Sequence, residues 1–203
     1  MKNQKFQFPD GPIFSLTRDF LMKLKVLLER KLRVFDFDDT LASTNGKIHV
    51  TFEGGKKKSL TPAEYALYFP NRKKGDKFDY TDFQKLIEPK AIPKVVNIMK
   101  NMVKAAGERY VMILTARRGS YKPIKDFMKT LGLNVKVITL GSGDPWDKRD
   151  WIGNQIEKGN FDDVMFFDDS IKNIKAVEML RDKYPKVKLV TRHIKYSPGY
   201  RGK

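Results

Sequence analysis

The chain has 203 residues, 40% hydrophobic and 32% charged, a balance typical of one folded domain with a single core. With no cysteine and only two histidines, a disulfide framework, a thiolate nucleophile and a cysteine-based zinc site are excluded, and histidine metal sites have little support. The 41 basic and 24 acidic residues leave a formal net charge of +17, which either attracts polyanionic partners or serves solubility alone.

The N-terminal stretch, residues 1–31, precedes the first predicted strand. Its beginning lacks the continuous apolar segment of a secretory signal, and no apolar run in the chain reaches the roughly 18 residues that span a bilayer. We therefore expect a cytoplasmic protein without a membrane partner. Within residues 15–31, Leu16, Phe20, Leu24 and Leu28 share the spacing of one helix face. This helix would pack on the core or bind a partner, and the sequence leaves both open.

Strand-like and helix-like segments alternate through the rest of the chain. Five short apolar runs are predicted as strands, at residues 32–37, 110–115, 135–140, 164–167 and 187–191. Helical periodicity fits residues 92–106, 120–131, 145–158 and 170–183, with Asp144 as a helix N-cap before Pro145. The strands are too uniformly apolar to face water on one side. The fold class predicted is therefore α/β, a Rossmann-like parallel sheet with helices on both faces.

Residues 41–91 interrupt this alternation directly after the first strand. They open with a predicted hairpin that turns at Gly54 and Gly55, followed by a helix with a Thr61–Glu64 capping box. Residues 71–80 are predicted as a charged loop, and another short helix begins at Thr81. We therefore expect three parts: an N-terminal helical extension (1–31), a core (32–40 and 92–203) and a small cap insert (41–91). A lid would occupy the position of this insert.

Acidic residues gather where two of the predicted strands end. Asp36, Asp38 and Asp39 close the first strand, and Asp168 and Asp169 close the fourth. In an open parallel sheet, the carboxyl ends of the strands meet at the edge where ligands bind. Carboxylates brought together there repel one another unless a cation neutralises them. Because all of these ligands are oxygens, Mg²⁺ is the cofactor predicted.

The segments VFDFDDTL, ILTAR, DPWDKRDWI and FFDDSIKNI, in that order, resemble the haloacid dehalogenase superfamily of aspartate phosphohydrolases over roughly residues 32–191. Residues 36–40 match its Asp-x-Asp-x-Thr motif, and Thr115 matches the Thr or Ser that ends the next strand. Lys148 matches the later lysine, and Asp168 with Asp169 matches the final acidic pair. Each motif is short enough to recur by chance, but all four occur in order and at their proper structural places.

The resemblance implies a phosphatase that works in two steps. Asp36 would attack phosphorus and form an aspartyl phosphate, which water then hydrolyses. Asp38 would protonate the leaving oxygen and later deprotonate the water. Mg²⁺ would be held by the Asp36 carboxylate, the Asp38 backbone carbonyl, Asp168 and Asp169, while Thr115 and Lys148 would bind the phosphoryl oxygens.

Other residues near these motifs leave alternatives open. Arg117 follows Thr115 and could reach a substrate phosphate, although exposed basic residues after a strand are also common. Lys172 lies close to the acidic pair and competes with Lys148 for the role of the catalytic lysine. Asn173 occupies a position at which relatives in that superfamily often carry an aspartate. It would either lie next to the metal ligands or be a helix residue without a role in the site.

The phosphate ester itself is less defined. The insert carries ten basic and six acidic residues, a net charge of +4, with aromatic residues interspersed. Such a mixture suits a nucleotide or a single-stranded end, unless the aromatics form the insert's own core. The segment DPWDKRDWIGNQI also resembles, more loosely, the phosphatase half of polynucleotide kinase/phosphatase proteins. The expected substrate is therefore a nucleotide or a nucleic-acid terminal phosphate. A small-metabolite phosphatase and a nucleic-acid-binding scaffold on an inactive fold are the alternatives.

Overall fold

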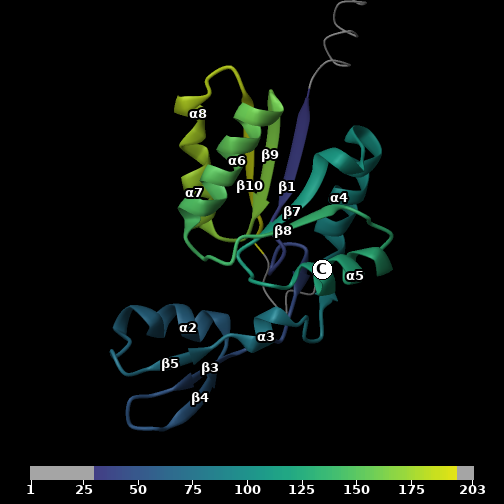
Figure 1. Cartoon of the computed structure of the whole chain (residues 1–203). Coiled ribbons are helices and arrows are strands. Elements are labelled where there is room, and N and C mark those ends of the chain that lie inside the picture. Colours follow the sequence, from purple (N-terminus) through teal and green to yellow (C-terminus); the bar gives the residue numbers. More distant parts are fainter. Residues whose placement is uncertain (1–29, 196–203) are drawn as a thin grey trace, which may run out of the picture.

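The computed structural model describes residues 30–195 and is built around one five-stranded sheet (Figure 1). The strand order is β10-β9-β1-β7-β8, and every neighbouring pair is parallel. The strands are β1 (Lys31–Phe35), β7 (Val111–Thr115), β8 (Lys136–Thr139), β9 (Asp163–Asp168) and β10 (Lys188–His193). The five predicted strands and the α/β Rossmann-like class are confirmed. The expected N-terminal helix lies almost wholly outside the described residues.

Helices cover both faces of this sheet, because successive residues of each strand point to opposite sides. One face packs on α4 (Pro93–Ala106) and α5 (Tyr121–Thr130), and the other packs on α6 (Pro145–Gly159) and α7 (Ile171–Glu178). The predicted helix over residues 170–183 is in fact two, since α7 ends at Glu178 and α8 (Leu180–Lys183) begins after Met179. A short 3₁₀ helix, η2 (Glu108–Tyr110), leads into β7.

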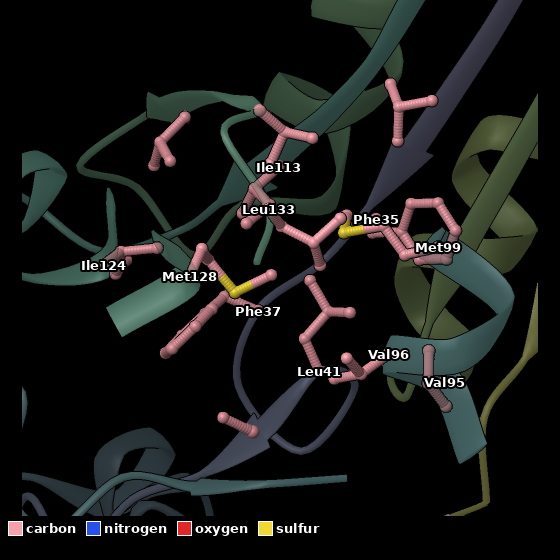
Figure 2. Packing of buried hydrophobic residues seen from close by; sticks show 14 of the residues in the cluster. Phe35, Phe37, Leu41, Val95, Val96, Met99, Ile113, Ile124, Met128 and Leu133 are labelled. Carbon is pink, nitrogen blue, oxygen red and sulfur yellow. The ribbon is translucent and has the colours of Figure 1, made fainter. Parts of the chain in front are cut away.

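The core on the α4 and α5 side contains Phe35 from β1, which stacks on Phe167 of β9 with ring centroids 4.3 Å apart. Met99 of α4 and Met128 of α5 belong to the same cluster, as Figure 2 shows. Phe37 within the acidic motif and Leu41 directly after it are fully buried in this cluster as well. The loop that carries the candidate catalytic residues is therefore anchored in the core on both sides.

The insert forms a small cap of its own. Its sheet has the order β4-β3-β5, made of β3 (Ile48–Thr51), β4 (Lys57–Leu60) and β5 (Lys77–Asp79). The hairpin is confirmed, with Gly55 at a φ of 79° in its turn. The remaining cap elements are β2 (Ala42–Ser43), α2 (Pro62–Tyr68), η1 (Phe69–Asn71), α3 (Thr81–Gln84) and β6 (Lys90–Ala91). Figure 1 shows the cap beyond the carboxyl ends of the core strands.

The structure tests three further expectations for the insert. The capping box is confirmed, since Thr61 Oγ1 accepts a hydrogen bond from the Glu64 amide and the Glu64 carboxylate accepts one from the Thr61 amide. The predicted loop over residues 71–80 is wrong in part, because residues 77–79 form β5 and Phe78 pairs with Val50. The insert's aromatics pack around Ile48, Val50 and Leu60, so most of them form its own core.

Among the described helices, none has the length and apolar character needed to cross a membrane.

Candidate active site

Three of the predicted acidic residues meet at the carboxyl edge of the sheet. Asp168 is the last residue of β9, and Asp36 directly follows β1, its amide donating to the Phe167 carbonyl at 2.8 Å. Because β1 and β9 are parallel neighbours, their ends deliver both carboxylates to one place. Carboxylate oxygens of Asp36, Asp168 and Asp169 all lie within 4.8 Å of one another. This is the arrangement expected of a divalent-cation site with oxygen ligands.

Lys148 connects the two buried carboxylates. Its Nζ lies 2.6 Å from Asp36 Oδ1 and 2.8 Å from Asp168 Oδ2, and its side chain is 3% exposed. The first turn of α6 positions it there, since Asp144 caps this helix by accepting from the Trp146 amide at 3.0 Å. Burial opposes the charge of Lys148, but the two carboxylates outweigh it and raise the pKa of its ammonium group. Of the two lysines considered from the sequence, the structure therefore brings Lys148 to Asp36.

Asn173 also contacts the acidic pair. Its Nδ2 lies 3.0 Å from each carboxylate oxygen of Asp168, and the Ser170 amide donates to Asp168 Oδ1 at 2.8 Å. Side chains of both α6 and α7 therefore donate hydrogen bonds to the Asp168 carboxylate. Thr115, at the end of β7, is buried at the same sheet edge and accepts through Oγ1 from the Arg117 amide at 3.2 Å.

The electrostatics of the cluster reflect crowded negative charge. Burial, with Asp168 and Asp38 nearby, raises the pKa of Asp36 well above its ordinary value despite the opposing charge of Lys148. Burial followed by the charges of Asp168 and Asp39 raises the pKa of Asp169 to about 6. Asp39 shifts the same way, chiefly through burial and then through Asp38. The cluster is short of positive charge, so its donor set fits a divalent cation.

These shifts predict how pH and Mg²⁺ act on stability. Since the pKa of Asp169 is raised to about 6 on folding, its contribution to the free energy of unfolding is full below about pH 4 and is lost as pH rises through 6. A divalent cation favours the ionised carboxylates and should restore that loss. We expect Mg²⁺ to raise the melting temperature more at about pH 7 than at about pH 5. Thermal melts of wild type and Asp169→Asn test this, and an equal gain at both pH values would contradict it.

Arg117 is buried, unlike the exposed basic residues that commonly follow a strand: only 4% of its surface is exposed. Its Nε and Nη2 bind the two carboxylate oxygens of Asp38 at 2.8 and 2.7 Å. Nη2 also donates to Thr44 Oγ1, and Nη1 donates to the carbonyls of Phe83 and Lys85 in the cap. All five N–H donors are therefore used within the protein. Substrate binding by Arg117 stays a prediction, and it would require some of these bonds to be exchanged.

Arg117 thus joins the candidate acid/base to the cap. We expect Arg117→Lys to lower the free energy of unfolding by about 1–3 kcal/mol, because one ammonium cannot replace a bidentate fork and three further hydrogen bonds. Urea unfolding measures this, and limited proteolysis should show faster cleavage within residues 71–85. Arg118→Lys is the matched control, since Arg118 is exposed and makes a single 3.4 Å contact with the Gly141 carbonyl. Equal effects of the two changes would contradict the assignment.

Some contacts of the site had no signal in the sequence. His193, at the end of β10, lies with its Nε2 2.8 Å from the Asp169 carbonyl oxygen. Thr44 and the Phe83 and Lys85 carbonyls reach Arg117 only because the cap folds back across the site. Asp39 takes a left-handed φ of 51°, a conformation that Asp tolerates better than most residues. A single sequence does not encode these pairings in any short pattern.

Comparison with known proteins adds no assignment, since no family model matches the chain and no curated protein matches it.

Proposed function

We propose that this protein is a magnesium-dependent phosphomonoester hydrolase of the haloacid dehalogenase type, with Asp36 as nucleophile. The observation that carries the proposal is the joining of Asp36 and Asp168 by one buried lysine, with Asp169 alongside, at the carboxyl edge of a parallel sheet. The four motifs that suggested the family come from separate parts of the chain. Their residues converge on this one edge.

Each residue of the site has a distinct role in the proposed reaction. A carboxylate oxygen of Asp36 attacks phosphorus, and the ester oxygen leaves with the electron pair of the broken bond. Asp38, whose side chain is 34% exposed, supplies a proton to that oxygen once one of its two contacts with Arg117 is exchanged. In the second step Asp38 takes a proton from the water that attacks the aspartyl phosphate, which restores Asp36 and releases phosphate. Lys148 and Thr115 lie at the same edge to hold the phosphoryl oxygens.

Asp36, Asp168 and Asp169, with the Asp38 backbone carbonyl, would hold the Mg²⁺ ion. When bound, the ion offsets the negative charge that develops on the phosphoryl group. The surplus of carboxylates, expressed in the raised pKa values of Asp36 and Asp169, supports a cation at this place.

For the substrate we propose a nucleotide or a nucleic-acid terminal phosphate, because the net charge of +17 favours a polyanion. The aromatic residues of the cap give less support than the sequence suggested, since they pack in the cap's own core. A small-metabolite phosphatase remains the second candidate. The cap favours this second candidate, because Arg117 connects the cap to Asp38. A lid that closes over a small substrate would need such a connection.

The experiment is a panel of phosphate esters assayed with Mg²⁺. It compares 3′-phosphorylated and 5′-phosphorylated oligonucleotides, nucleoside monophosphates and sugar phosphates. We expect phosphate release, lost in Asp36→Asn, with an oligonucleotide or nucleotide turned over fastest. Steep weakening by salt with oligonucleotides alone would show phosphate contacts beyond the site. Preference for sugar phosphates by orders of magnitude would overturn the substrate, and no release from any ester would overturn the enzyme.

A further inference from the structure

One buried arginine fixes the carboxylate of Asp38. Nε and Nη2 of Arg117 donate to the two carboxylate oxygens at 2.8 and 2.7 Å. Such a two-point pair fixes the plane of a carboxylate as well as its position, which a single ammonium group does not do. The Asp38 side chain is nevertheless 34% exposed, so its carboxylate has a fixed direction and is still open to the sheet edge.

The guanidinium group of Arg117 is itself fixed by the cap. Nη1 donates to the carbonyls of Phe83 and Lys85 at 3.1 and 2.9 Å. The Phe83 ring centroid lies 5.0 Å from the guanidinium carbon, and the ring of Phe37 in the core lies 5.9 Å from the same atom. The orientation of the guanidinium group therefore depends on where this part of the cap lies relative to the core.

Thr44 contacts the same pair from the other end of the cap. Its Oγ1 accepts from Arg117 Nη2 at 2.8 Å and donates to Asp38 Oδ1 at 3.3 Å. Thr44 directly follows β2, where the chain enters the cap, and β2 pairs with β6, where the chain returns to the core. Contacts from both ends of the insert therefore converge on Arg117 and Asp38.

A buried arginine at this place has three possible roles: binding the substrate phosphate, joining the cap to the core, or orienting Asp38. Phosphate binding is disfavoured because all five N–H donors of Arg117 have partners within the protein. Orientation has a chemical reason, since Asp38 would serve the leaving oxygen and then the attacking water from one position. A group that transfers protons must stay within roughly 10–20° of its productive direction.

The contacts of Arg117 also allow Asp38 to act as an acid. Nη2 has a second partner in Thr44, whereas Nε bonds to Asp38 alone. If the Nη2 contact with Asp38 is exchanged when a proton is present, Nε and Nη1 still hold the guanidinium group in place. The carboxyl group then keeps its direction through both proton transfers.

Building on the proposed function, we propose that Arg117 is a positioning residue for proton transfer and acts through Asp38. Thr44 and the two cap carbonyls set the orientation of its guanidinium group, so the cap contributes to proton transfer without contacting the phosphate. Steps that need a proton from Asp38 depend on Arg117. Attack of Asp36 on an ester whose leaving group needs no acid does not depend on it.

The first turnover of two esters separates the three roles, with full-length Arg117→Lys and Mg²⁺ in a rapid-mixing experiment. This variant keeps the positive charge and loses the two-point pair. The first release of nitrophenol from nitrophenyl phosphate should stay within about twofold of wild type, because that group leaves without an acid. The first turnover of glycerol phosphate should slow about tenfold or more, with KM unchanged for both esters. An unfolded fraction would lower the amplitude for both esters equally and would leave this comparison of rates valid.

Two outcomes of that experiment would overturn the proposal. A raised KM for both esters would show that Arg117 binds the phosphate. Equal slowing of both esters would show that it only joins the cap to the core. If wild type releases phosphate from no ester, the proposed function fails and this inference fails with it, whereas an active wild type with either of the first two outcomes refutes this inference alone.

A double-mutant cycle tests whether Arg117 acts through Asp38. In an Asp38→Asn background, Arg117→Lys should slow glycerol phosphate no further, because the group that it positions is gone. Thr44→Val should show the same selective loss to a smaller degree, and Thr44→Ser, which keeps the hydroxyl, should restore the rate. Arg118→Lys is the matched control and should change nothing, since Arg118 is exposed. Additive losses in the cycle, or equal losses in the two Thr44 variants, would overturn the proposal.

Discussion

Asp36→Asn should lower the rate of phosphate release by about a thousandfold or more, because the amide cannot form the acyl phosphate on which both chemical steps depend. The comparison is made at saturating Mg²⁺ with the best ester of the substrate panel. Asn has nearly the same size as Asp, so the packing of the buried Phe35 and Phe37 on either side is kept.

The same variant should melt at a temperature at least equal to that of wild type without Mg²⁺. Burial raises the pKa of Asp36, so an ionised Asp36 lowers stability above that pKa, and the neutral amide avoids this while Lys148 keeps its contact with Asp168. Asp39→Asn is the matched control, because Asp39 belongs to the same motif and Asn also tolerates its φ of 51°. It should keep activity within a few-fold of wild type. Full activity in Asp36→Asn, or unfolding of that variant, would contradict the assignment.

Lys148→Met should have the second largest effect, and it should act on activity and stability together. Removal of the ammonium leaves Asp36 and Asp168, with side chains 7% and 0% exposed, without their shared cation. Breaking a buried ion pair from one side costs about 3–5 kcal/mol, so the metal-free protein should lose about that much free energy of unfolding. Phosphate release should fall by about a hundredfold to a thousandfold.

Urea unfolding with and without Mg²⁺ measures the stability effect, and Mg²⁺ should return part of it by binding the same carboxylates. Lys172→Met is the matched control, since Lys172 is also a lysine near the acidic pair in sequence but is exposed on α7. It should change neither quantity appreciably. Similar effects of the two substitutions would mean that charge in general, rather than the Lys148 contacts, supports the site.

The core of the fold could be predicted because its signals are local. The apolar runs ending at Asp36 and Asp168 have the length and composition of buried parallel strands, and the structure places both residues at one edge. The position of Lys148 followed from its spacing after Asp144 and Pro145, which begin α6. In each case a few neighbouring residues determine the geometry.

The surroundings of Asp38 could not be predicted, because they depend on contacts distant in sequence. From the sequence, Arg117 is expected to be an exposed basic residue after a strand. In the structure it is buried, and it donates hydrogen bonds to the Phe83 and Lys85 carbonyls of the cap. The strand β5 was missed for the same reason, since the charged residues around Phe78 hide a pairing with Val50. Tertiary pairing here overrides local propensity.

The most direct test of the central claim is detection of the phosphoryl group on Asp36 itself. An Asp38→Asn variant, incubated with Mg²⁺ and an aryl phosphate whose leaving group needs no acid, should accumulate the aspartyl phosphate because its hydrolysis lacks a base. After an acid quench, mass spectrometry should find phosphate on the peptide that contains Asp36, and hydroxylamine should remove it. Phosphate release without such a peptide, or with the label on another residue, would contradict Asp36 as the nucleophile.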